Sequence, residues 1–120
     1  MKSHAAVAAE LLGSAELVDS VLADFETSLL QDREKVLFRF VRKVNHDSVS
    51  IGPADIGLMH EAGYTDEATY YAITVCALFN FYNRWIDASG VHAMSDEAHR
   101  VAAKRSAIHG YARSSQPPAK

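Results

Sequence analysis

Cysteine is the scarcest reactive residue in this sequence of 120 residues, which contains one, Cys76. A single thiol excludes an intrachain disulfide framework and any metal cage built only from thiolates of this chain. Long apolar runs are missing too, because no stretch approaches the ~18 uninterrupted apolar residues that span a bilayer, and the first residues lack the apolar core of a secretory signal. We therefore predict no membrane partner and a cytoplasmic location.

The sequence also lacks a strong excess of one charge. Twelve Lys and Arg stand against 15 Asp and Glu, which gives a formal net charge of -3. A mildly acidic protein has no general attraction to phosphate backbones or anionic lipid, so nucleic acid is not expected as a partner. Basic residues do gather between Arg33 and Lys43, but Asp32 and Glu34 lie beside or among them. We interpret this segment as a solvated helix face.

The composition is that of a globular chain, with 48% hydrophobic and 22% charged residues. The length corresponds to one domain, which we place over residues 1–112, followed by a disordered tail over residues 113–120. No segment shows the sustained period-two alternation of a strand, and turn signals divide the chain into about six helical segments. These features predict an all-α fold.

Glycine, serine and proline mark the expected helix ends. We predict that helices stop at Gly13, Gly63, Gly90 and Gly110. Ser14 and Ser95 are placed as N-caps, and Pro53 suits the first turn of a helix. The clearest amphipathic helix covers residues 32 to about 45, and the longest covers about 66 to 89. Because the longest helix is apolar on nearly every side between residues 70 and 86, we predict that it is the central, buried element.

A polar stripe interrupts this long apolar helix. It consists of Asn80, Asn83, Arg84 and Asp87, at i, i+3, i+4 and i+7. Buried amides and charges need hydrogen-bond partners, so the stripe either bonds neighbouring helices, lines a pocket or meets another subunit. The spacing also permits an ion pair between Arg84 and Asp87. In the pocket interpretation the aromatic neighbours Phe81, Tyr82 and Trp85 would contribute to the lining.

Other reactive residues carry weaker signals. Cys76 lies in mid-helix among apolar neighbours, which favours an inert core cysteine over a reactive thiol, unless Arg84 or a histidine reaches it in the fold. The six histidines include no pair with the spacing of a helical zinc site, so we predict no metal. His4 could act as a base, but nothing near it in sequence offers a nucleophile. The sequence has no Gly-rich phosphate loop and no nucleophile elbow, and no cofactor is expected.

The run from Ala77 to Val91, ALFNFYNRWIDASGV, closely resembles a helix motif of a known family. That family is the peroxidase-related branch of the alkylhydroperoxidase (AhpD-like) and carboxymuconolactone decarboxylase superfamily. The segments 61–67 and 32–37 resemble it in the same order, and together the likeness covers about residues 5 to 110. It implies an AhpD-like domain of about six helices packed around one long buried helix, and association into a homo-oligomer, a dimer or higher.

The same resemblance implies a thiol-dependent peroxidase, whose active centre is a Cys-x-x-Cys-x-x-x-His motif. Only His4 matches this motif, as its final histidine, and both cysteines would precede Met1. Cys76 matches neither motif position. Three explanations remain: the chain is truncated, it is a degenerate paralogue, or the missing helix comes from another polypeptide.

These observations leave three functional hypotheses. The first is an alkylhydroperoxidase-like protein without the redox-active cysteine pair, with no or only residual peroxidase activity on its own. The second is a non-catalytic small-molecule-binding or assembly module built on the polar stripe. The third is thiol-free acid and base catalysis, as on the decarboxylase side of the superfamily, with His4 and a residue such as Glu10 as the acting groups.

Overall fold

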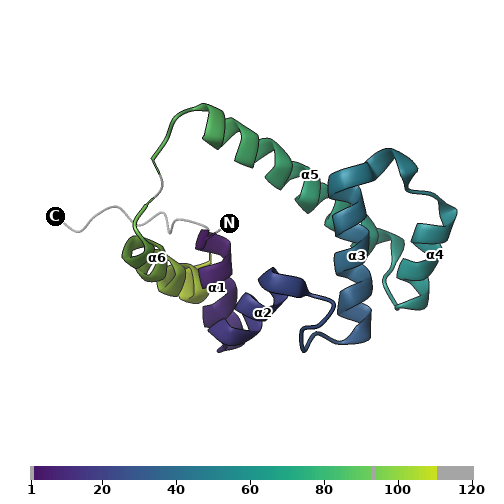
Figure 1. Ribbon diagram of the computed structural model, residues 1–120, viewed down its shortest axis with the longest axis horizontal. Coiled ribbons are helices and arrows are strands. Elements are labelled where there is room, and N and C mark those ends of the chain that lie inside the picture. Colours follow the sequence, from purple (N-terminus) through teal and green to yellow (C-terminus); the bar gives the residue numbers. More distant parts are fainter. Residues whose placement is uncertain (1, 93, 111–120) are drawn as a thin grey trace. The chain divides into compact units, whose positions relative to one another are not determined.

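The computed structural model describes residues 2–92 and 94–110 (Figure 1). Over these ranges the chain forms helices and no strand, so the predicted all-α fold is confirmed. The elements are α1 (Lys2–Leu12), α2 (Ala15–Asp24), α3 (Asp32–Asp47), a 3-10 turn η1 (Ser48–Ser50), α4 (Pro53–Glu61), α5 (Asp66–Ala88) and α6 (Asp96–His109). None of the helices described is both long and apolar enough to cross a membrane. The predicted disordered tail, residues 113–120, lies outside the described residues.

The predicted helix ends are confirmed at the level of individual bonds. The hydroxyl of Ser14 accepts a hydrogen bond from the Leu17 amide at 3.1 Å, and the hydroxyl of Ser95 accepts one from the Ala98 amide at 3.2 Å. Pro53 occupies the first turn of α4. Gly63, which follows α4, has φ of 85°, a left-handed conformation that glycine adopts without the steric cost of a side chain.

Contacts within the chain gather into two compact units. Unit 1 comprises residues 1–23 and 93–120, and unit 2 comprises residues 24–92. Unit 1 therefore holds α1, most of α2 and α6, whereas unit 2 holds α3, α4 and α5. The single domain over residues 1–112 stays a prediction.

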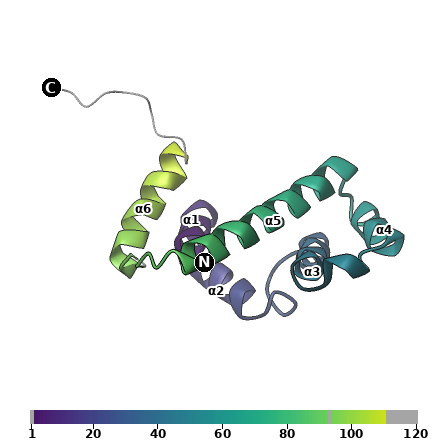
Figure 2. The ribbon, with the colours of Figure 1, turned by 90° about the horizontal axis from the view of Figure 1, so that it is seen from above.

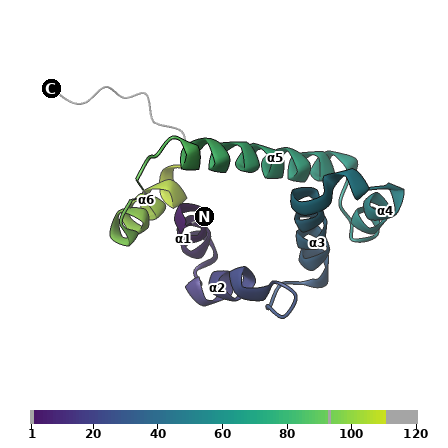
Figure 3. The ribbon, with the colours of Figure 1, turned by 45° about the horizontal axis from the view of Figure 1, so that its top comes forward.

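Unit 1 is built on the pairing of α1 with α6, which lie side by side (Figures 1 and 3). Both helices are rich in alanine, the residue with the highest helix propensity. The buried apolar side chains of this unit are Val7 of α1, Val18 of α2 and Ala103 of α6. Short side chains let two helix axes approach closely, so the packing leaves little room for a larger group.

Unit 2 is built on α3, which packs against both α4 and α5 (Figure 2). Its buried apolar side chains are Phe40 of α3 and Met59 of α4. Lys43 of α3 donates hydrogen bonds of 2.7 and 2.8 Å to the carboxylate of Asp55 in α4. The Lys43 ammonium, together with the Gly52 amide, lowers the pKa of the Asp55 carboxyl. These contacts hold the first turn of α4 against α3.

The long helix α5 is not the buried element that its apolar sequence predicts. Thr69 is its one buried residue, and the side chains of Tyr70, Phe81 and Trp85 are 67%, 61% and 61% exposed. The prediction is wrong because α5 has 23 residues and is therefore about 34 Å long. Within unit 2, α3 and α4 pack against only part of this length (Figure 3). An apolar helix surface is expected to pack against another apolar surface. The sequence of the helix does not specify whether that second surface belongs to the same chain.

Candidate functional site

An open groove of about 900 Å³ lies between α3 and α5, within unit 2. Its walls are mostly apolar and include Phe38 and Val41 of α3 and Tyr71, Val75 and Phe79 of α5. The volume lies in the range of small-molecule sites, about 300 to 1,000 Å³. The groove is therefore the candidate site, and its shape follows from the crossing of α3 over the face of α5.

Polar side chains line part of the groove and form a hydrogen-bonded network. The Asn80 side-chain amide donates to Oδ1 of Asn45 at 2.6 Å and to the Cys76 carbonyl at 3.0 Å. Nη1 of Arg84 donates to Oδ1 of Asn80 at 2.8 Å and to the Asn80 carbonyl at 3.1 Å. Asn80 thus joins α3 to α5 and holds the guanidinium of Arg84. Asn83 and His46 also line the groove.

The thiol of Cys76 also lines the groove, and it is half-buried rather than fully enclosed. Its Sγ lies 3.9 Å from the Val41 carbonyl oxygen and 3.7 Å from the Asn80 side-chain nitrogen. Neither partner is a cation or a helix N-terminus, the surroundings that mark reactive cysteines. Cys76 therefore packs against α3 as a half-buried residue, and its inertness stays a prediction.

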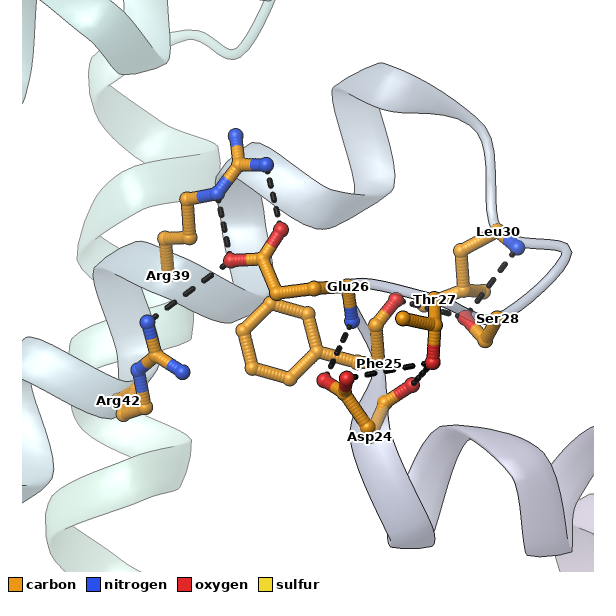
Figure 4. Close-up of polar contacts among 8 residues, drawn as sticks. All are labelled: Asp24, Phe25, Glu26, Thr27, Ser28, Leu30, Arg39 and Arg42. Carbon is orange, nitrogen blue, oxygen red and sulfur yellow. Dashed lines mark hydrogen bonds and ion pairs between the residues drawn. The ribbon is translucent and has the colours of Figure 1, made fainter.

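Phe25, which lies in the segment before α3, also lines the groove, and its side chain is drawn in Figure 4. The Phe25 ring stacks on the Phe38 ring with centroids 5.5 Å apart, and the guanidinium of Arg42 lies 4.9 Å from the Phe25 centroid. Aromatic stacking and cation–π contacts each add stabilisation beyond area burial. Phe25 is therefore held in place by two residues of α3.

Glu26 fastens the same segment to α3 (Figure 4). Its carboxylate accepts hydrogen bonds of 2.7 and 2.5 Å from Nε and Nη2 of Arg39, and it lies 3.8 Å from Nη2 of Arg42. The bidentate bond to Arg39 lowers the pKa of the Glu26 carboxyl and raises the pKa of the guanidinium. The adjoining turn is closed by the Asp24 side chain, which accepts from the Glu26 amide at 3.0 Å.

The structure separates the residues that the sequence grouped in one stripe. Asn80 and Asn83 line the groove, and Arg84 is bound to Asn80. Asp87 and Trp85 are exposed and do not line it. The expected ion pair between Arg84 and Asp87 is not among the ion pairs formed by the residues described, because Arg84 turns to Asn80 instead. Phe81 and Tyr82 do not line this groove, and their role in a pocket or an interface stays a prediction.

The other residues singled out from the sequence lie on α1, in unit 1. His4 and Glu10 are both exposed there. They are six positions apart on one helix, so they do not share a face, because helical neighbours on a face are three or four positions apart. Across the ranges that the structure describes, no group of three His, Cys, Asp or Glu side chains could hold a metal ion.

Sequence reasoning missed the contribution of α3 to the groove. Asn45 and His46 were not singled out, because each reads as an ordinary polar residue near a helix end. Phe25 was missed for a different reason, since it lies outside the regular helices that periodicity detects. A usable signal was present, because the polar stripe on α5 required partners and Asn45 supplies one.

Comparison with known proteins adds no family assignment. No protein-family model matches this chain, and no curated protein matches it.

Proposed function

We propose that this chain is an alkylhydroperoxidase-like protein of the peroxidase-related branch that has no dithiol cycle of its own and binds a small molecule in the α3–α5 groove. The resemblance of residues 77–91 supports the family, and the single cysteine supports the loss of the cycle. The observation that carries the binding role is the groove itself, an apolar cleft with an asparagine network at its wall.

The chemistry of the family needs two sulfurs. One thiolate takes an oxygen atom from the peroxide, which leaves as an alcohol, and becomes a sulfenic acid. A second thiol then attacks the sulfenic sulfur, so that a disulfide forms and water leaves. Cys76 supplies one thiol, and its sulfur faces the Val41 carbonyl and the Asn80 amide. We infer at most residual peroxidase activity from this chain on its own.

The lining of the groove indicates the chemical class of the ligand. Tyr71, Val75 and Phe79 offer a broad apolar wall, which fits a flat aromatic or aliphatic body. The Asn80 amide is engaged with Asn45, Cys76 and Arg84, so the Asn83 amide, which also lines the groove, provides the donors and the acceptor for a single uncharged or anionic polar end. Apolar walls with a few convergent polar groups are typical of ligand sites. We therefore assign the groove to a small amphipathic molecule.

We also propose that the protein forms a homo-oligomer, as the family resemblance implies, and that it functions in the cytoplasm, as predicted from the lack of long apolar runs in the sequence. The exposed apolar surface of α5 supports association, because monomeric proteins rarely leave large contiguous apolar patches uncovered.

Titration with 8-anilinonaphthalene-1-sulfonate, a flat apolar molecule with one anionic end, tests the groove. We expect saturable binding that shifts the side-chain amide signals of Asn45, Asn80 and Asn83 in NMR spectra.

Val75→Glu should weaken this binding at least tenfold, since a carboxylate in the wall costs about 1.4 kcal/mol or more against an apolar, anionic probe. The matched control is Val49→Glu, because Val49 is exposed on η1 and does not line the groove. Equal binding to both variants, or unchanged asparagine signals, would contradict the assignment.

A further inference from the structure

The face of α5 that points away from the groove carries an exposed stripe. Its members recur at alternating steps of three and four residues: Glu67, Tyr70, Thr74, Ala77, Phe81, Arg84 and Ala88. All of them are exposed, and none lines the groove. Steps of three and four are the spacing of the contact positions in a pair of helices packed side by side. We call these residues the α5 seam.

The types of side chain along the α5 seam follow nearly the same order from either end, except that the charges at the two ends are opposite. Between residues 67 and 84 an acid, Glu67, lies at one end and a base, Arg84, at the other, and Ala88 follows one turn beyond Arg84. The aromatic residues Tyr70 and Phe81 come next inward, with side chains 67% and 61% exposed. The small residues Thr74 and Ala77 occupy the centre. This order makes the surface complementary to itself when one copy is reversed.

We propose that the α5 seam is a homodimer interface in which the α5 helices of two copies pack antiparallel about a two-fold axis between residues 75 and 76. In this register Glu67 of one copy faces Arg84 of its partner, Tyr70 faces Phe81, and Thr74 faces Ala77. The two-fold axis repeats each contact, as it must in an interface made from one patch on both subunits. The occupant is thus a second copy of this chain.

The local structure suits this arrangement. The small residues at the centre let the two helix axes approach closely, while the aromatic residues fill the space on either side. The Thr74 hydroxyl already donates to the Tyr70 carbonyl at 2.8 Å, so its burial leaves no unpaired donor. Both hydrogen bonds from Arg84 to Asn80 come from Nη1. A guanidinium has further N–H donors, which can reach a carboxylate of the second copy.

Charge reversal at the two ends tests the register. The inference rests on the proposed homo-oligomer and is independent of the ligand of the groove. We expect a dimer by sedimentation equilibrium at micromolar concentration. Glu67→Arg and Arg84→Glu should each raise the dimer dissociation constant at least about tenfold, because symmetry places two like-charge contacts in every dimer. An equimolar mixture of the two variants should form heterodimers, and the double variant should dimerise again.

The controls reverse charges outside the α5 seam. Glu61→Arg on α4 and Arg100→Glu on α6 change exposed residues and should leave the dissociation constant unchanged. Circular dichroism of each variant shows whether it is folded. A wild-type protein that is monomeric throughout would overturn both this inference and the proposed oligomer. A dimer whose dissociation constant is unchanged by the charge reversals, or variants that fail to form heterodimers when mixed, would contradict the α5 seam as the interface. The proposed oligomer would then stand without this interface.

Discussion

Replacing Met59 with alanine should lower the free energy of unfolding of unit 2 by about 3 kcal/mol, within the range of about 2 to 5 kcal/mol for Leu, Ile or Met to Ala in a core. Met59 is 0% exposed and is the largest fully buried side chain among the residues described. Truncation removes apolar area from the contact between α4 and α3 and leaves a cavity that a short helix cannot close completely. The change is measured by urea unfolding monitored by circular dichroism.

The preceding residue provides the control for Met59. Leu58 lies on the same helix and loses a similar volume on substitution by alanine, but its side chain is 56% exposed. We expect Leu58→Ala to cost less than about 1 kcal/mol, because truncation there removes less buried surface and leaves no enclosed cavity. Equal losses at the two positions would mean that the packing of α4 differs from the one described.

Replacing Ala103 with leucine should destabilise the pair α1 and α6 by about 2 kcal/mol, the middle of the range for added methylenes in a packed site. Ala103 is 2% exposed on α6, and α6 packs against α1. The leucine side chain has no space between two closely packed, alanine-rich helices, so the helices must separate or the side chain must adopt a strained rotamer. Hydrogen exchange of the α1 and α6 amides reports the loss locally.

Ala102 is the matched control for Ala103, because it is the adjacent residue of the same helix and is exposed. Ala102→Leu adds the same atoms on the outside of α6 and should change amide protection by no more than about 0.5 kcal/mol, the range of neutral surface substitutions. Strong loss of protection in this control, or none in Ala103→Leu, would contradict the observed orientation of α6.

The helical content and the helix ends follow from the sequence because their causes are local. Ser14 and Ser95 cap helices through bonds to amides three positions away, and Gly63 adopts the left-handed conformation that ends α4. Such signals depend on neighbours in the chain, so they can be recognised without any tertiary structure. The start of α5 at Asp66 and its end at Ala88 were located in this way to within one residue.

The burial of α5 and the composition of the groove could not be predicted in the same way. Periodicity identifies an apolar face but does not identify the element that covers it. The groove depends on where α3 crosses α5, which brings Asn45 beside Asn80 across 35 positions of sequence. Phe25 lines the groove beside Phe38 and Arg42 of α3, and the adjacent Glu26 is bound by Arg39 and Arg42. These are long-range contacts, and no local pattern specifies them.

The two faces of α5 differ in their proposed roles. The face that carries Asn80 and Cys76 borders the groove, and the α5 seam lies on the opposite face. A long helix that is apolar on nearly all sides can serve both roles in a small protein, because each face is covered by a different partner.

Consumption of an organic hydroperoxide in the presence of a dithiol reductant tests the central claim most directly. We predict that the wild-type protein and Cys76→Ser consume peroxide at the same rate, equal to the rate of the reductant alone, because the half-buried Cys76 thiol faces a backbone carbonyl and a neutral side-chain amide rather than a cation. Turnover by the wild-type protein that is lost in Cys76→Ser would contradict the claim and identify Cys76 as a peroxidatic thiol.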